Sequence, residues 1–127
     1  MFKVFRTLTF DKELSKLSKS EQGIIKKFEE KLVENPFVGK PLSYKFLREK
    51  KFNGKRAYFL IYEDYVIVLM MAISDKKTQQ ETINEIKLHM KYYYEYVKET
   101  LSKIQATLFI LPAFISSKLL MNCLIRS

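Results

Sequence analysis

The stretch from residue 44 to residue 58 interleaves cations with aromatic residues. The cations are Lys45, Arg48, Lys50, Lys51, Lys55 and Arg56, and the rings are those of Tyr44, Phe46, Phe52 and Tyr58. Cations hold phosphates and aromatic rings stack on unpaired bases, so this mixture suits single-stranded RNA. An edge strand that its lysines protect from aggregation would show the same composition. Composition alone gives the two interpretations equal weight.

A second group of charges, Asp75-Lys76-Lys77-Thr78, directly follows the most hydrophobic run of the chain. Charges placed at the end of a buried strand are held by a rigid element, which favours a site. The alternative is an ordinary helix N-terminus capped by Asp75 or Thr78. Two adjacent lysines fit that alternative poorly, because the positive end of the helix dipole disfavours cations.

The other reactive residue types exclude several kinds of site. The chain has one cysteine, Cys123, and one histidine, His89, so an internal disulfide and a Cys/His zinc site are both excluded. This cysteine usage fits a reducing cytoplasm. His89 falls within a predicted helix, where a partly buried structural role is favoured over that of a general base. No nucleophile–base pair, glycine-rich phosphate loop or carboxylate cluster stands out, and no cofactor is predicted.

Length and charge narrow the choice of partners. The 127 residues are enough for one domain with a real core, and the formal net charge is +9. A strongly basic chain points to phosphate, an anionic membrane surface or an acidic partner protein, without choosing among them.

Two hydrophobic runs must position the charged groups. Residues 56–62 and 65–73 are typical of strands, and the two-residue acidic link between them favours an antiparallel hairpin. Such a hairpin places Arg56 beside Lys76 and Lys77. Positive charge is therefore expected at one edge of a rigid sheet.

The remaining elements complete an α+β domain. Residues 1–10 alternate like a strand, and two helices are expected to follow, the first capped by Asp11 and the second by Ser20. Asn35-Pro36 ends the second helix, because the residue before proline disfavours the α region. Three segments remain, namely a connector at 37–42, an extended segment at 44–52 that the Asn53-Gly54 turn joins to the next strand, and a long helix at 79–101. The expected order is β-α-α-β-β-β-α, an antiparallel sheet packed by helices.

Residues 102–127 are expected to form an extension outside this domain of residues 1–101. The composition becomes apolar from Ile104 onward. A membrane span needs about 20 largely apolar residues, and Pro112 and Lys118 interrupt the run. A membrane anchor is therefore less favoured than a further helix, an oligomer contact or an unstructured tail taken together.

The order of the elements and several short segments resemble the RelE/ParE superfamily of toxin–antitoxin toxins over about residues 1–100. The matching segments are Phe10–Leu17, Asn35-Pro36, Gly39–Leu42, Leu47–Glu49, Gly54–Arg56, Tyr62 and Ala72–Thr78. The resemblance implies a small basic toxin that a cognate antitoxin wraps and blocks. RelE-like members cut mRNA in the ribosomal A site without a metal, by attack of the ribose 2′-OH on the adjacent phosphate.

The resemblance also implies site residues. Arg56 matches the family's arginine at the start of the third strand and Lys76 its basic residue after the fourth, both in catalytic roles that stabilise the transition-state phosphate. Arg48 and either Lys50 or Lys51 fall near the basic residues of the second strand, in a register that is uncertain by one. The remaining residues expected to contact RNA are Lys55, Tyr58 and Lys77.

One segment departs from the family. RelE-like nucleases usually carry a Tyr or His shortly after the last strand, whereas Gln79–Thr82 has neither, and nothing selects Glu81 as a base. Three functions therefore stay open: a ribosome-dependent mRNA endonuclease, a ParE-like toxin that binds DNA gyrase, and a degenerate member that only binds RNA or an antitoxin-like partner. For the first, Arg56→Ala is expected to abolish toxicity with little loss of stability, because an arginine at a sheet edge contributes little to packing.

Overall fold

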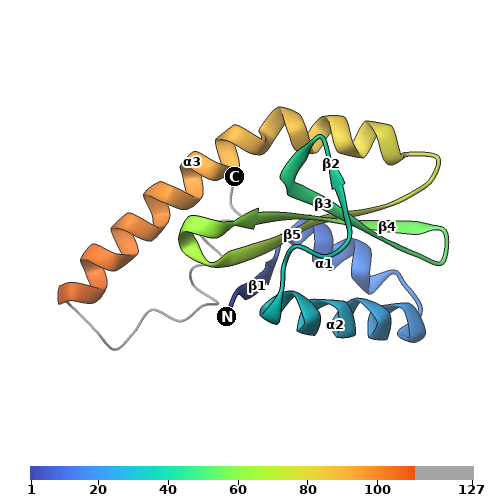
Figure 1. The fold of residues 1–127 in the computed structure, drawn as a ribbon, viewed down its shortest axis with the longest axis horizontal. Helices are drawn as coiled ribbons and strands as arrows, with labels where there is room; N and C mark the ends of the chain where they lie inside the picture. Colours follow the sequence, from blue (N-terminus) through green and yellow to red (C-terminus); the bar gives the residue numbers. More distant parts are fainter. Residues whose placement is uncertain (111–127) are drawn as a thin grey trace. The chain divides into compact units, whose positions relative to one another are not determined.

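The computed structural model describes residues 1–110, apart from the side chains of residues 96, 100 and 103–110. The chain divides into two compact units, Met1–Ile83 and Asn84 onward. The elements are β1 (Lys3–Arg6), α1 (Leu8–Ser15), α2 (Lys19–Glu34), β2 (Lys40–Leu42), β3 (Tyr44–Phe52), β4 (Lys55–Tyr62), the 3-10 turn η1 (Glu63–Tyr65), β5 (Ile67–Asp75) and α3 (Gln79–Ile110). The first unit contains the whole sheet, α1, α2 and the start of α3 (Figure 1).

The five strands form one sheet in the order β1-β5-β4-β3-β2. Three of the four pairings are antiparallel, and β1 runs parallel to β5. The predicted α+β class with an antiparallel sheet packed by helices is confirmed, and β1 adds one parallel pair that was not predicted. Two helices and three strands separate β1 from β5 along the chain, so no tight turn fixes their relative direction and a parallel pairing is allowed.

The predicted turn and hairpins account for most of the register. Asn53 and Gly54 both have positive φ, +46° and +75°, as a tight two-residue hairpin turn requires. The link between β4 and β5 is longer than expected, because η1 and the left-handed Val66 fill it. The pairing of Arg56 with Ser74 nonetheless leaves Lys76 and Lys77 just beyond the end of β5, as predicted.

Helices α1 and α2 cover one face of the sheet (Figure 1). The buried cluster between them contains Phe10 and Leu14 of α1, Ile25, Phe28 and Leu32 of α2, and Phe52, Ala57, Phe59, Ile61, Val68, Met70 and Ile73 of the strands. Both predicted N-caps were wrong by a few residues. Thr7, rather than Asp11, caps α1, and Ser18, rather than Ser20, caps α2 in a capping box with Glu21. Asn35 ends α2 as predicted.

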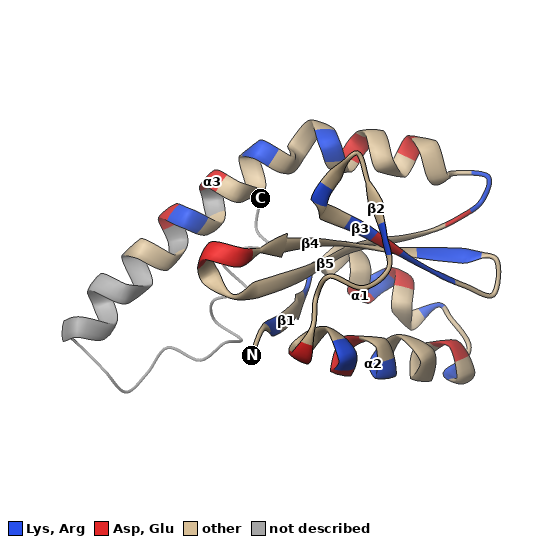
Figure 2. Ribbon diagram, viewed as in Figure 1, with Lys and Arg blue, Asp and Glu red and all other residues tan. Residues whose placement is uncertain are grey.

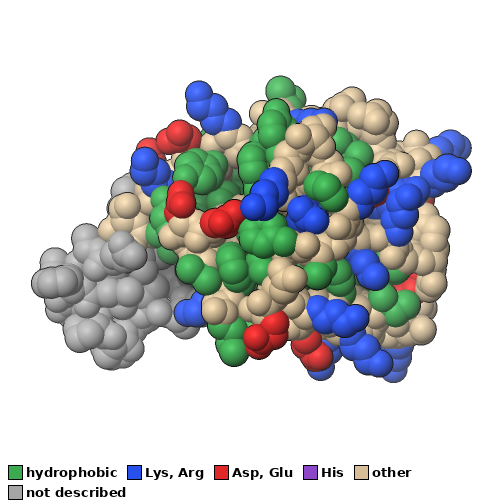
Figure 3. Space-filling model, viewed as in Figure 1, with side chains coloured by type: hydrophobic (Ala, Val, Ile, Leu, Met, Phe, Trp, Pro, Cys, Tyr) green, Lys and Arg blue, Asp and Glu red, His purple; other side chains and the backbone are tan. Residues whose placement is uncertain are grey.

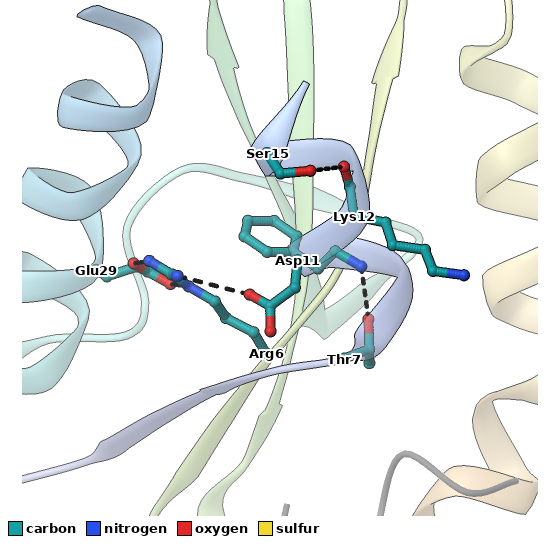
Figure 4. A network of polar contacts seen from close by, with 7 residues as sticks. Arg6, Thr7, Asp11, Lys12, Ser15 and Glu29 are labelled. Carbon is teal, nitrogen blue, oxygen red and sulfur yellow. Dashed lines mark hydrogen bonds and ion pairs between the residues drawn. The ribbon is translucent and has the colours of Figure 1, made fainter. Parts of the chain in front are cut away.

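Polar side chains form hydrogen bonds with the backbone of β5 beyond the end of β1. The Thr7 hydroxyl donates to the Met71 carbonyl at 2.8 Å, and a Glu13 carboxylate oxygen accepts from the Ile73 amide at 3.1 Å. These two groups satisfy backbone that β1 does not reach, next to the bulge at Met71. Figure 4 shows the neighbouring ion pairs, in which the Arg6 guanidinium contacts Glu29 of α2 and Asp11 of α1. Side chains from three elements thus fasten the helices to the sheet.

Helix α3 extends to Ile110, beyond the end expected near residue 101. Within the residues that the structure describes, no helix combines the length and apolar character needed to cross a bilayer. The predictions made for residues 111–127 lie outside the described residues. The proposed boundary between residues 101 and 102 stays a prediction.

Candidate functional site

One end of the sheet collects cations from two connections. The β3–β4 hairpin and the segment between β5 and α3 lie at this end, and Figure 2 shows Lys or Arg residues in blue in both. Lys51 pairs with Arg56 across β3 and β4, and Arg56 pairs with Ser74 across β4 and β5. Lys76 and Lys77 follow directly and are exposed. On the face shown in Figure 3, Lys and Arg side chains also gather toward the hairpin end.

The alternation of β3 settles which of its cations share a face with Arg56. Residues directly opposite each other on paired strands point to the same side, so Lys51 lies on the face of Arg56. Lys50 points to the other face, where its ammonium lies 5.4 Å from the ring centroid of Phe28 in α2. Of the two lysines left open by the sequence, Lys51 is the one that faces the same way as Arg56.

Arg48 binds the backbone of the segment that leads to β2. Its guanidinium donates to the carbonyls of Val38 at 2.9 Å and Gly39 at 3.2 Å, and to those of Phe37 and Lys45. The same segment is held against β3 as the short strand β2, which the sequence predicted only as a connector. Four backbone acceptors occupy the Arg48 donors in this structure, which gives this residue a structural role.

Lys55 is also engaged, because its ammonium lies 2.7 Å from a carboxylate oxygen of Glu21. This hydrogen bond is the main reason that the pKa of Glu21 lies below its ordinary value of 4.5. The partner sits at the N-terminus of α2, where the helix dipole also favours a carboxylate. Lys55 therefore ties the hairpin to α2.

This ion pair predicts a pH dependence of stability. A carboxyl group whose folded pKa is depressed stabilises the fold above its unfolded pKa, and this contribution disappears as pH falls through the folded pKa. We expect Lys55→Met to lower the free energy of unfolding near neutral pH and to leave it less sensitive to pH below 4.5. Urea unfolding of both proteins across this range measures the difference. Lys51→Met, at a neighbouring lysine, is the control, and an equally steep acid dependence in Lys55→Met would contradict the assignment.

Arg56 is nearly buried at this end of the sheet and does not lie at an exposed edge. Its side chain is only 10% exposed, and β4 lies between β5 and β3 in the interior of the sheet. The guanidinium Nε lies 4.0 Å from Oε2 of Glu49, whose side chain is fully buried. The expectation that Arg56 contributes little to packing was therefore wrong.

Glu49 is the residue that sequence reasoning missed. Oε2 accepts a hydrogen bond from the Gln79 side chain at 3.2 Å, while Oε1 has no hydrogen-bond partner among the described residues. The only signal in the sequence was that Glu49 interrupts a run of cations. A buried carboxylate needs a cation close by, so its position follows from that of Arg56.

Tyr58 lies opposite Glu49 across β3 and β4 and is completely buried. Its hydroxyl is 2.7 Å from Oγ of Ser74, which itself donates to the Asp75 carbonyl. Burial raises the pKa of Tyr58 above its ordinary value. The ring is out of reach of a base in this structure, so the expectation that Tyr58 contacts RNA directly is corrected to a structural role.

Asp75 shapes the segment that carries the exposed lysines. One carboxylate oxygen accepts from the Thr78 amide at 2.9 Å and from the Thr78 hydroxyl at 3.0 Å, and these bonds lower the pKa of Asp75. The Thr78 carbonyl then accepts from the Thr82 amide, so α3 begins at the predicted place. Lys76 and Lys77 lie on a short ordered turn next to the last buried strand.

A shallow pocket of about 210 Å³ lies at the β3–β4 turn and is lined by Lys51, Phe52, Asn53, Gly54, Lys55 and Arg56. Three of its six lining residues are cationic, which suits an anion such as phosphate. In the described part of the chain, no group of three or more His, Cys, Asp or Glu side chains lies close enough to hold a metal ion. The cationic lining of the pocket can stabilise negative charge.

Comparisons with known proteins place this fold. No family model and no curated protein sequence matches the chain. Among solved structures, a chain of the intact E. coli RelBE toxin–antitoxin complex aligns with a TM-score of 0.55 and 18% identity, over 59% of this chain and 96% of that one. The isolated E. coli RelE toxin gives 0.54 and 17%, over 68% and 99%. The Mycobacterium tuberculosis RelBE2 toxin–antitoxin complex gives 0.52 and 22%, over 59% and 91%. The chain has the fold of RelE toxins.

Proposed function

We propose that this RelE-like fold is the toxin of a type II toxin–antitoxin pair, and that it cuts mRNA on the ribosome in the cytoplasm. The observation that carries the proposal is the set of cations at one end of the sheet, formed by Lys51, Arg56, Lys76 and Lys77. These residues come from β3, β4 and the segment after β5, and each lies within or directly after a strand of the sheet. Positions held in this way can address one phosphate group together.

The reaction that fits such a site is attack of the ribose 2′-OH on the adjacent phosphate. The new bond joins the 2′ oxygen to phosphorus, the bond to the 5′ oxygen of the next nucleotide breaks, and a cyclic phosphate and a 5′-OH result. Lys76 and Lys77 are exposed and able to approach the phosphate, while the nearly buried Arg56 supplies positive charge from within the sheet. Preorganised cations stabilise the extra negative charge of the transition state in this reaction.

A cognate antitoxin is the partner that follows from this proposal. The E. coli and M. tuberculosis neighbours are toxin–antitoxin complexes, and a chain of net charge +9 suits an acidic partner. Because these neighbours are RelE proteins, a ribonuclease is favoured over a ParE-like gyrase-binding toxin. A binding protein without catalysis is the second candidate, since Gln79–Thr82 offers neither an imidazole nor an aromatic ring at the start of α3.

The double variant Lys76→Ala/Lys77→Ala tests the site with least risk to the fold. Both side chains are exposed, so we expect unchanged thermal stability. Cleavage should fall on the order of a hundredfold, the usual effect of removing a preorganised group that stabilises transition-state charge. Growth after induction and the mapping of new mRNA 5′ ends are the two readouts. The matched control is Lys26→Ala/Lys27→Ala, an exposed pair of adjacent lysines on α2.

Each outcome of this experiment selects one function. New 5′ ends at codon-periodic positions with the wild type and the control, but not with Lys76→Ala/Lys77→Ala, would support a ribosome-dependent nuclease. Growth arrest without new ends would point to a toxin that acts by binding. Absence of arrest with the wild type would leave a degenerate binding protein.

A further inference from the structure

Two exposed aromatic side chains lie at the start of β3, at the opposite end of this strand from Lys51. Tyr44 is 45% exposed and Phe46 is 39% exposed. Their rings are stacked, with centroids 5.2 Å apart and planes inclined by 20°. This segment lies before the first pairing of β3 with β4, which is Leu47 with Leu60. The cation-and-aromatic motif of residues 44–58 is thus divided, since Phe52 and Tyr58 are buried and only this pair reaches the surface.

The surroundings of this aromatic pair, Tyr44 and Phe46, are cationic. Lys40 and Lys45 are exposed, and the Lys45 ammonium lies 4.8 Å from the ring centroid of Phe37. No Asp or Glu occurs between Pro36 and Arg48, and the next acidic residue, Glu49, is buried. A segment that combines stacked rings with exposed lysines and has no acidic residue of its own is complementary to a ligand with flat bases and a negative backbone.

We propose that the aromatic pair is a second contact site for single-stranded RNA, in which a base stacks on the rings and the positive charge of Lys40 and Lys45 attracts the phosphate backbone. At about 3.3 Å per strand residue, the two rings lie roughly 17–23 Å from Lys51 along β3. The pair therefore binds a part of the strand away from the phosphate at the hairpin end. The inference rests on the proposed function only in taking RNA as the ligand, and it concerns binding rather than cleavage.

The test measures binding of the full-length protein to a fluorescent single-stranded RNA of about 12 nucleotides, within the site sizes usual for such grooves. We expect Tyr44→Ala/Phe46→Ala to weaken binding about tenfold to a hundredfold, the effect of losing one stacked base. Tyr44→Phe/Phe46→Tyr keeps both rings and should bind like the wild type. Tyr92→Ala is the matched control, because Tyr92 is an aromatic residue of α3 that is 51% exposed. Equal melting temperatures of the four proteins establish that folding is unchanged.

Two results would overturn the inference: unchanged affinity of Tyr44→Ala/Phe46→Ala, or an equal loss of affinity for duplex RNA, which has no free bases to stack. Loss of antitoxin binding with unchanged RNA binding would assign the surface to a protein partner instead. The cleavage experiment remains separate. RNA binding that depends on the rings, without new mRNA ends, would support this site and contradict the proposed nuclease. New mRNA ends, with RNA binding that does not depend on the rings, would support the nuclease and contradict this site.

Discussion

Replacing Arg56 with alanine is expected to abolish toxicity and to cost the fold about 3–5 kcal/mol, the usual penalty for removing one partner of a buried ion pair. The cost arises because Glu49 has a fully buried side chain and would lose the cation beside it. Gln79 would remain as its hydrogen-bond donor, but an amide does not neutralise a carboxylate. Urea unfolding measures the stability, and growth after induction measures the toxicity.

A charge-neutral double variant separates the two effects of this change. Glu49→Gln/Arg56→Gln removes both charges, so we expect it to be more stable than Arg56→Ala while remaining non-toxic. If Arg56→Ala is non-toxic only because it unfolds, the double variant should regain toxicity together with stability. An Arg56→Ala protein as stable as the wild type would show that Glu49 does not depend on Arg56.

The elements that sequence reasoning placed correctly have strong local causes. Asn53-Gly54 is one of few dipeptides that favour positive φ twice in succession, and Pro36 stops α2 through its own ring. These two features, with the hydrophobic runs of β4 and β5, were enough to place Arg56 near Lys76. The fold class followed from the order of such segments.

The features that were missed depend on contacts between distant residues. β4 and β5 are buried on both faces, so their composition does not tell which side of the sheet Arg56 or Tyr58 faces. β2 contains Pro41 and only three residues, and it exists because β3 and Arg48 hold it in place. The burial of Glu49 could be seen only once the register of β3 and β4 was known.

Among substitutions of the glycines, we expect Gly39→Ala to cause the largest loss of stability, about 2–5 kcal/mol. Gly39 has φ of +78°, where an L side chain is strained, and a Cβ would lie 2.5 Å from the Glu49 carbonyl oxygen. The obstacle is backbone of β3, which cannot turn aside as a flexible side chain can. β2 would have to leave β3, and the carbonyl of Gly39 would be lost to Arg48.

The other two glycines of the chain separate the causes of this loss. Gly54 has φ of +75° but open space around a Cβ, so Gly54→Ala carries the backbone strain alone, about 1–2 kcal/mol. Gly23 lies inside α2, also with open space, so Gly23→Ala should stabilise the protein by roughly 0.5–1 kcal/mol. Urea unfolding of the three variants should therefore rank Gly23→Ala above the wild type, then Gly54→Ala, then Gly39→Ala. If Gly39→Ala and Gly54→Ala lost equal stability, the contact with β3 would be too loose to hold the segment that leads to Tyr44, and Arg48 would be left as its main attachment.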